Sequence, residues 1–400
     1  MSSKYATFTG MGVHMRWDRR FPSIRGKAYY ASCSQGPLSL DVVKAMRRYQ
    51  ESIIKWGNPW DEWMEEVYRA SALFAEIIGA RDGEVCPHYS ASSGLISLLS
   101  SFKPVGRRKI VTTDLDYPTL GVTLQGARLN GFEVVTIRST GGIVELDQYE
   151  KAVDENTLML ATFQVSALNG FRQDVGALSE ICHRRGAHLL IDAYQGVGVV
   201  PIDVERDGVD FLVAGTTKFL LGIPGAGFLY VRDGLADSLE PSAVSWFSQR
   251  DPFLFGPEKM DYRPGARRFE MGTWSVVSMY AAAAGMSIIR EIGVEKIWNH
   301  VNRMRDFFRD EALSRGFEPY SPVEKPLGPT FSIHVGGRSH EIEKWMRRRR
   351  VITSARGPGL RFAHHFFNTR ADAEKALDTL GKVLKHAKVT ASQPGAGQSL

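Results

Sequence analysis

Cysteines are scarce in this chain of 400 residues, and long apolar runs are missing. The three cysteines, Cys33, Cys86 and Cys182, are an odd number without C-x-x-C spacing, which argues against a disulfide framework and a zinc site. No segment reaches the about 18 apolar residues of a membrane-spanning helix, and the N-terminal residues show no signal-peptide pattern. We therefore predict a cytoplasmic protein with no metal site and no membrane partner.

The charge balance is that of an ordinary globular protein. The net charge is +6, with 24% charged and 43% hydrophobic residues, which is enough to bury the cores of one large and one smaller domain. The densest basic run, Arg347–Arg350, ends a helical pattern that opens with acidic residues, and arginine is favoured near a helix C-terminus. We predict no nucleic-acid partner. Cys86 and Cys182 lie in apolar or helical context and are expected in the core, whereas the role of Cys33 stays open.

Helices and strands alternate through the middle of the chain. This order is typical of an α/β fold with a mostly parallel central sheet flanked by helices. The predicted strands are Lys109–Thr113, Glu133–Ile137, Leu158–Thr162, His188–Ile191, Asp210–Ala214 and Gly227–Val231. The predicted helices are Leu40–Trp56, Trp60–Ile78, Ser93–Phe102, Thr119–Leu129, Val175–Arg185 and Val276–Glu291.

The second half of the chain predicts a smaller C-terminal α+β domain. It should contain a strand near Thr330–Val335 and helices near His340–Arg348 and Ala371–Ala387. We predict an N-terminal arm over 1–30, a large domain over 31–290 and a small domain over 291–388. The small polar residues of 389–400 predict a disordered tail.

Two opposite charges follow neighbouring strands of the predicted sheet. Asp192 ends one strand core and Lys218 lies just past the next, before a glycine-rich turn. Because parallel strands present their carboxyl ends at one edge, we expect both side chains to open into the same crevice. An amine for covalent anchoring and an anion for a ring nitrogen suit pyridoxal phosphate.

Several motifs around this pair resemble a known family. They are Tyr30–Pro37, Ser90–Gly94, Asp192–Gln195, Thr216–Lys218, Phe269–Thr273 and Arg361–Thr369, and they occur in the family's order. The chain resembles the class V aminotransferase superfamily of fold-type-I pyridoxal-phosphate enzymes, which includes cysteine desulfurases, selenocysteine lyases, kynureninases and isopenicillin N epimerases. The resemblance runs from Ala28 to about Leu380.

The resemblance implies roles for the residues around the cofactor ring. Lys218 would be the Schiff-base lysine, Asp192 would hold the pyridine nitrogen protonated, and Gln195 would bond the phenolic oxygen. Tyr117 would stack on the ring. The plainer alternatives are a surface lysine, a helix-capping aspartate and a core tyrosine.

The resemblance also implies a phosphate site and a partner. Ser92, Ser93 and Gly94 at a helix N-terminus would bind the phosphate together with Thr217, although simple N-capping would explain one serine. The family often has Ser and His where this chain has Gly215 and Thr217. The pair Gly272 and Thr273 would reach the cofactor of a second subunit, so we expect a homodimer with shared active sites.

The predicted substrate is an α-amino acid. Arg361 matches the family's carboxylate-binding arginine, and a guanidinium is a natural bidentate clamp; a structural arginine is the alternative. The resemblance adds Ser34 and, from a tryptophan-rich segment, Asn58 as pocket residues, with core packing equally open for the latter. His364 and His365 are expected to pack rather than to transfer protons.

The sequence argues against one branch of the family. Desulfurases carry a mobile cysteine shortly before the carboxylate-binding arginine, and the stretch Val351–Arg361 has none. We therefore predict β-elimination of the C–S lyase type on a cysteine-like or S-conjugated secondary-metabolite substrate. Transamination, decarboxylation coupled to deamination, and epimerisation remain alternatives, because the cofactor supports each of them. A non-enzymatic module is disfavoured because Lys218 is present and no DNA-binding domain is added.

Overall fold

The computed structural model describes residues 17–81, 83–254 and 258–391. Residues 1–16, in the predicted arm, and 392–400, in the predicted tail, lie outside the described residues. The last helix, α11, runs from Arg370 to Ala391, so helical structure continues three residues into the segment predicted to be disordered. The division into domains stays a prediction, although the packing below is compatible with it.

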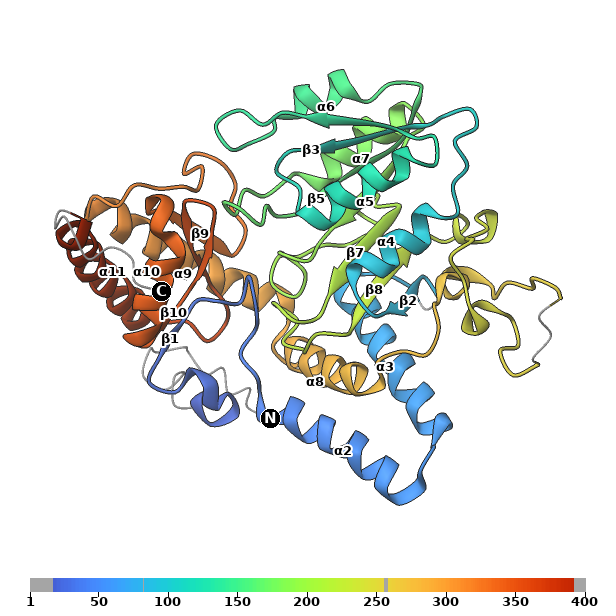
Figure 1. Cartoon of the computed structure of the whole chain (residues 1–400), viewed down its shortest axis with the longest axis horizontal. Coiled ribbons are helices and arrows are strands. Elements are labelled where there is room, and N and C mark those ends of the chain that lie inside the picture. The colour runs from blue at the N-terminus through green and yellow to red at the C-terminus, as the bar shows by residue number, and fades with distance from the viewer. Residues whose placement is uncertain (1–16, 82, 255–257, 392–400) are drawn as a thin grey trace, which may run out of the picture.

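The central sheet has seven strands in the order β2-β8-β7-β6-β5-β3-β4. Strands β3 to β7 pair in parallel, whereas β8 is antiparallel to both β7 and β2. The predicted α/β class with a mostly parallel sheet is thus confirmed (Figure 1). The bounds are β2 Val85–His88, β3 Lys109–Thr113, β4 Glu133–Ile137, β5 Thr157–Phe163, β6 His188–Asp192, β7 Phe211–Gly215 and β8 Gly227–Val231.

Strand β2 was not predicted. Its sequence, VCPH, contains a proline, which disfavours strand interiors because it cannot donate a ladder hydrogen bond. The strand lies at the end of the sheet and pairs only with β8. At an edge the missing donor of Pro87 costs little, and the edge position could not be read from the sequence.

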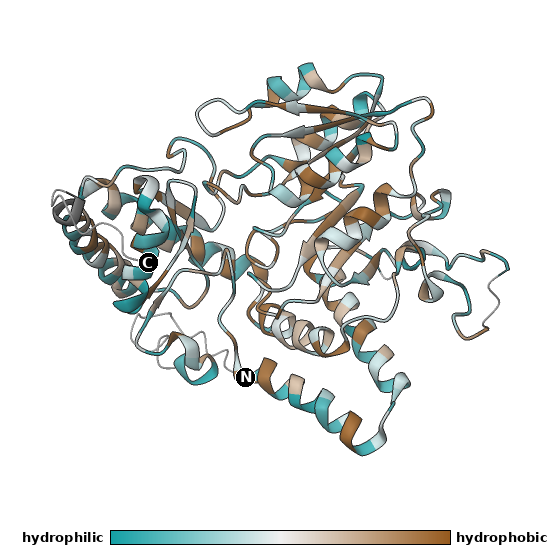
Figure 2. Ribbon diagram, viewed as in Figure 1, coloured by the Kyte–Doolittle hydropathy of each residue, from teal (hydrophilic) through white to brown (hydrophobic). Residues whose placement is uncertain are grey.

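Both faces of the sheet are buried, and alternate strand residues serve different cores. Leu189 and Ile191 pack with α3, α7 and α8, whereas Leu190 packs with α4 and α5 on the other face. Figure 2 shows the hydrophobic colouring of these central strands. The helices are α2 Leu40–Trp56, α3 Trp60–Ile78, α4 Ala91–Leu99, α5 Pro118–Arg128, α6 Leu146–Ala152, α7 Val175–Arg184 and α8 Val276–Ile292.

A third core belongs to the C-terminal part of the chain. Its antiparallel sheet has the order β11-β12-β9, and Figure 1 shows it at the left, beside the last helices. The N-terminal strand β1 joins this part by pairing in parallel with β10. The bounds are β1 Ala28–Tyr29, α9 Val294–Ser314, β9 Thr330–His334, α10 Ser339–Arg348, β10 Val351–Ile352, β11 Ser354–Arg356 and β12 Gly359–Ala363.

Membrane-spanning helices and metal-ligand clusters are both absent from the described ranges. None of the helices there combines the length and the apolar character that a bilayer crossing requires. Likewise, no three His, Cys, Asp or Glu side chains of the described ranges gather as metal ligands would.

Candidate active site

Asp192 and Lys218 meet at the carboxyl edge of the central sheet. Asp192 is the last residue of β6 and pairs with Val213 of β7, and Lys218 follows the end of β7 by three residues. They line one small cavity between the sheet and the loop after β5. Its lining residues are Tyr117, Phe163, Val165, Ala167, Asp192, Tyr194, Gln195 and Lys218. The predicted crevice is therefore present, and the three residues expected around the cofactor ring besides the lysine, Tyr117, Asp192 and Gln195, all line it.

The Lys218 amine lies against two tyrosine rings. Its Nζ is 3.9 Å from the ring centroid of Tyr194 and 5.2 Å from that of Tyr117. The Tyr194 hydroxyl is hydrogen-bonded to the hydroxyl of Thr217. The sequence predicted the aromatic at 117 but missed Tyr194, whose position one residue before Gln195 was the available signal.

Gly215 lies directly against Tyr194. A Cβ at position 215 would lie 2.3 Å from the tyrosine ring, so a side chain there would force the ring to shift. Glycine, where the family often has serine, leaves room for this position of the ring. The absence of a side chain at position 215 thus allows the Tyr194 ring to lie close to the Lys218 amine.

The pKa of Lys218 is lowered to about 8, mainly by burial. Asp192 and Cys33 oppose this shift, whereas the positive charges of Arg361 and Arg356 contribute to it. Desolvation disfavours the ammonium because it removes the hydration of the charge. Only the neutral amine is a nucleophile, so this environment activates Lys218 near physiological pH.

This shift predicts a pH dependence for cofactor loading. The rate at which pyridoxal phosphate attaches covalently to the apoenzyme should rise with pH through a midpoint near 8. An ordinary lysine has a pKa of 10.5, so its neutral fraction would still be small there. Stopped-flow absorbance between pH 6 and 11 measures the rate, with N-acetyl-lysine as the reference amine. A midpoint near 10.5 in the protein would contradict the activation of Lys218.

Asp192 is held in place by its own turn. Its Oδ1 accepts a hydrogen bond of 2.9 Å from the backbone N–H of Tyr194. Burial raises the pKa of Asp192, while that hydrogen bond and Lys218 act in the opposite direction. A carboxylate held in this way needs a cationic partner, which a protonated pyridine nitrogen would supply.

A second carboxylate, Asp116, lies close enough to Asp192 for their charges to interact. The sequence did not point to this residue. Burial raises the pKa of Asp116 to about 7, and Asp192 adds to the rise. Asp116 accepts hydrogen bonds from the side chains of Thr112, Thr113 and Thr162. The one sequence feature that could have indicated Asp116 is its position shortly after β3. An acidic residue directly before Tyr117 matches no recognisable motif, so it was not singled out.

The start of α4 forms the predicted phosphate end of the site. Ser90 is the N-cap, and its side chain and that of Ser93 bond each other's backbone N–H in a capping box. The Ser93 hydroxyl therefore already accepts a hydrogen bond from the Ser90 N–H. The Ser92 side chain makes no hydrogen bond with the part of the chain described here. Gly94 packs closely, since a Cβ there would lie 3.2 Å from the Leu229 side chain.

Gly272 and Thr273 lie near this helix start, but at the surface. The N–H of Gly272 bonds the Ser245 hydroxyl, and the Tyr89 hydroxyl bonds the carbonyl of Met271. Thr273 is exposed. The single chain does not bring Thr273 to Lys218, so its predicted role in a partner's site remains a proposal.

Arg361 is buried and oriented by three acceptors. It is 1% exposed, Nη1 donates to the carbonyl of Ala167 at 2.8 Å, and Nη2 donates to the Ser354 hydroxyl at 2.7 Å. Nε reaches the carbonyl of Ser354 at 3.4 Å. Each terminal nitrogen keeps one further N–H that no described acceptor takes up.

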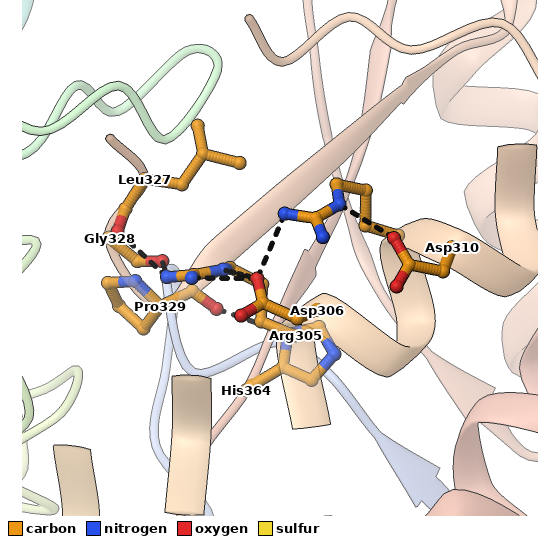
Figure 3. A network of polar contacts seen from close by, with 8 residues as sticks. Arg305, Asp306, Asp310, Leu327, Gly328, Pro329 and His364 are labelled. Atoms are coloured by element: carbon orange, nitrogen blue, oxygen red, sulfur yellow. Dashed lines mark hydrogen bonds and ion pairs between the residues drawn. The ribbon is translucent and has the colours of Figure 1, made fainter. Parts of the chain in front are cut away.

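A polar network fixes the loop on which Arg361 rests. Arg305 of α9 donates to the carbonyls of Leu327 and Gly328, as Figure 3 shows, and Gly328 donates to the carbonyl of Gly170. Position 170 lies in the same loop as Ala167, the acceptor for Arg361. The C-terminal part of the chain is therefore docked on the loop after β5, and this docking positions the guanidinium.

The remaining predicted residues separate into two groups. His364 and His365 are fully buried, their ring nitrogens bond the carbonyls of Pro329 and Phe219, and burial lowers the pKa of each imidazole to about 3. Both are packing residues, as the sequence indicated. Ser34 is exposed in the loop after Cys33. Asn58 is exposed in the turn between α2 and α3, and the structure does not bring it to the site within this chain.

The three cysteines differ in position. Cys86 and Cys182 are fully buried, which confirms them as core residues. Cys33 is also buried, but its carbonyl accepts a hydrogen bond of 3.1 Å from Gln195, so it borders the site. A larger cavity of about 240 Å³ lies elsewhere, beside the start of α7; it contains none of the predicted site residues.

Comparison with known proteins identifies the family. The family model described as aminotransferase class-V matches residues 38–373. This chain belongs to the class-V aminotransferase family. An uncharacterized aminotransferase, YcbU, from Bacillus subtilis is 36% identical over 371 residues, covering 93% of this chain and 98% of the relative. A probable cysteine desulfurase from Methanothermobacter thermautotrophicus is 25% identical, covering 87% and 86%. The family assignment makes this protein a pyridoxal-phosphate enzyme.

A solved structure supports the fold. The apo cysteine desulfurase from Thermococcus onnurineus NA1 superposes with a TM-score of 0.82 at 21% identity, covering 95% of this chain and 99% of that structure. At this identity the likeness shows the fold-type-I architecture. The chain's own residues fit the cofactor, because a lysine with a lowered pKa, a buried aspartate and a helix N-terminus line the same edge of the sheet.

Proposed function

We propose that the protein catalyses β-elimination on an α-amino acid that carries sulfur at its β-carbon, either cysteine-like or S-conjugated. The supporting observation is the hairpin formed by β11 and β12. Arg356 pairs with Gly359, so only Gly357 and Pro358 form the turn. A turn this short has no room for the mobile cysteine with which desulfurases accept sulfur, and elimination needs no such thiol.

We propose the following roles for the residues that meet at the sheet edge. When bound, pyridoxal phosphate supplies an electron sink for negative charge at the substrate α-carbon. Lys218 would anchor it and would afterwards take the proton from the α-carbon. Asp192 would keep its ring nitrogen protonated, Tyr117 would provide an aromatic face for the ring, and Gln195 would bond the phenolic oxygen. Ser92, Ser93 and Gly94, with Thr217, bind the phosphate at the start of α4.

The substrate is proposed to be held by its α-carboxylate. The two remaining N–H groups of Arg361 donate hydrogen bonds to it, which would direct the Cα–H bond toward Lys218. The bond between the β-carbon and sulfur then breaks, the electron pair leaves with sulfur, and the sulfur takes a proton. Hydrolysis of the released enamine gives pyruvate and ammonia, so the net reaction adds one water and oxidises nothing.

The proposed reaction is tested by its products. The holoenzyme is supplied with a panel of amino acids and cysteine S-conjugates, and pyruvate, ammonia, CO₂ and other keto acids are measured. Equal amounts of pyruvate, ammonia and thiol are expected. CO₂ release would indicate decarboxylation, keto-acid formation that depends on an acceptor would indicate transamination, and loss of optical rotation alone would indicate epimerisation. Any of these results without thiol release would overturn the elimination proposal.

Replacing Arg361 by lysine should impair substrate capture more than cofactor binding. A point charge in place of a bidentate fork should cost about 2 kcal/mol or more in kcat/KM. The visible absorbance of the holoenzyme should persist, because the proposed cofactor ligands lie at the edge of the central sheet and at the start of α4, away from β12. Arg347→Lys, at the exposed end of α10, is the control. If Arg361→Lys loses the cofactor or unfolds while substrate affinity is kept, the arginine is structural.

We also propose that the enzyme is a homodimer with shared active sites, in which Gly272 and Thr273 bind the partner's cofactor phosphate. Thr273 is exposed in the single chain, so its hydroxyl is available to a partner, which supports this arrangement. Large apolar side chains are exposed in the single chain, among them Ile54 at 84% and Trp56 at 58%. Such groups are typical of interfaces, so they also support a dimer. Two further points remain parts of the proposal. The location is cytoplasmic, and Ser34 and Asn58 belong to the substrate pocket.

A further inference from the structure

The hairpin of β11 and β12 presents two arginines on one face. Ser354 pairs with Arg361, and Arg356 pairs with Gly359. Residues two apart on a strand point to the same side, so Ser354, Arg356 and Arg361 share a face. The alternate residues, Ala355 and Leu360, are buried in the C-terminal core. The arginine face is therefore turned away from that core and toward the active site.

The two arginines have different surroundings. Arg361 is enclosed and bonded to three acceptors, as described above. Arg356 is exposed, and no carboxylate in the described part of the chain pairs with its guanidinium. Its one aromatic neighbour there is Tyr117, whose ring centroid is 5.8 Å from Cζ. Such an arginine has its donors available to a ligand.

Arg356 and the Lys218 amine share a neighbour, the ring of Tyr117. Lys218 and Arg356 both lie over the ring of Tyr117, at 5.2 Å and 5.8 Å. A substrate held by Arg361 at its α-carboxylate has its α-carbon near Lys218. Arg356 is an exposed cation whose charge acts on Lys218, so the distal end of a substrate that extends from Lys218 toward solvent past Tyr117 would meet it.

We propose that Arg356 binds a second anionic group of the substrate, a carboxylate at the distal end of the side chain or leaving group. The inference deepens the proposed function and rests on it for the placement of the α-carboxylate on Arg361. It names the substrate class as amino acids with two carboxylates rather than simple cysteine. A planar guanidinium without a counter-ion binds a carboxylate with two charge-assisted hydrogen bonds.

The test uses two substrates that differ in one charge. S-Carboxymethyl-L-cysteine and S-carbamoylmethyl-L-cysteine have the same shape, but only the first has a distal carboxylate. The wild-type holoenzyme should favour the carboxymethyl compound in kcat/KM by about tenfold or more, the discrimination expected when a charged hydrogen bond is present or absent. Arg356→Gln should remove that preference by weakening the carboxymethyl substrate, while the carbamoyl substrate changes less than about threefold.

Two further measurements separate the possible outcomes. Arg356→Lys should keep part of the preference, and Arg347→Gln should keep all of it. Titration of the holoenzyme's visible absorbance with each compound reports binding even when no product forms. If no thiol is released but the titration still discriminates the charge, the reaction type is wrong and the role of Arg356 stands. Equal affinity for both compounds in the wild type, or equal losses in Arg356→Gln, would overturn the role of Arg356.

Discussion

Replacing Lys218 by alanine is expected to abolish covalent attachment of the cofactor and essentially all turnover. Purified wild-type protein should be yellow, and borohydride should bleach the band and fix the cofactor to the chain. In Lys218→Ala no amine with a lowered pKa remains at the cavity, so borohydride should leave no cofactor bound after denaturation. Mass spectrometry of the denatured protein measures this. The variant should still bind the cofactor non-covalently at the start of α4.

The control for this experiment is an exposed lysine. Lys344→Ala, on α10, should behave as the wild type because its amine is solvated and distant from the sheet edge. The substitution at 218 removes a half-buried side chain over Tyr194, so thermal unfolding should be measured beside the chemistry. A borohydride-fixed adduct in Lys218→Ala at the wild-type level would show that another amine anchors the cofactor.

Asp192→Asn is expected to keep the fold and lose most of the turnover. The asparagine side-chain oxygen can still accept the hydrogen bond from Tyr194, so the turn after β6 should survive. The carboxylate charge is lost, and with it the partner for a protonated pyridine nitrogen. Removing a preorganised electrostatic group of this kind costs about 2.7–4 kcal/mol, roughly a hundred- to a thousandfold in kcat.

Three readouts decide the role of Asp192. Circular dichroism should be unchanged, the visible band should shift, and kcat for product release should fall by the stated factor. Asp310→Asn, at the surface of α9, should leave all three unchanged. Turnover within about threefold of the wild type in Asp192→Asn would show that the residue only orders its turn.

Much of the fold was readable from local sequence patterns. Five parallel strands and β8 were predicted within a residue or two of their bounds, because strands buried on both faces are continuous apolar runs. The helices Leu40–Trp56 and Trp60–Ile78 were predicted with the observed ends, since a capping serine and flanking glycines mark them. Helix α9 was not predicted. It mixes many charges with a buried stripe that includes Arg305, and such a stripe is recognisable only once its packing partners are known.

The sequence by itself indicated the cofactor of this protein, pyridoxal phosphate, and left several of its reactions open. An aspartate and a lysine at the ends of adjacent buried strands must meet, because parallel strands end at one edge of the sheet. The tertiary structure alone decided which other groups surround the amine. Tyr194, Asp116 and Arg356 come from separate segments, and their approach to Lys218 depends on Gly215, on the packing of β3 and on the β11–β12 register. Distances between such segments follow from packing and strand pairing, which no local pattern encodes.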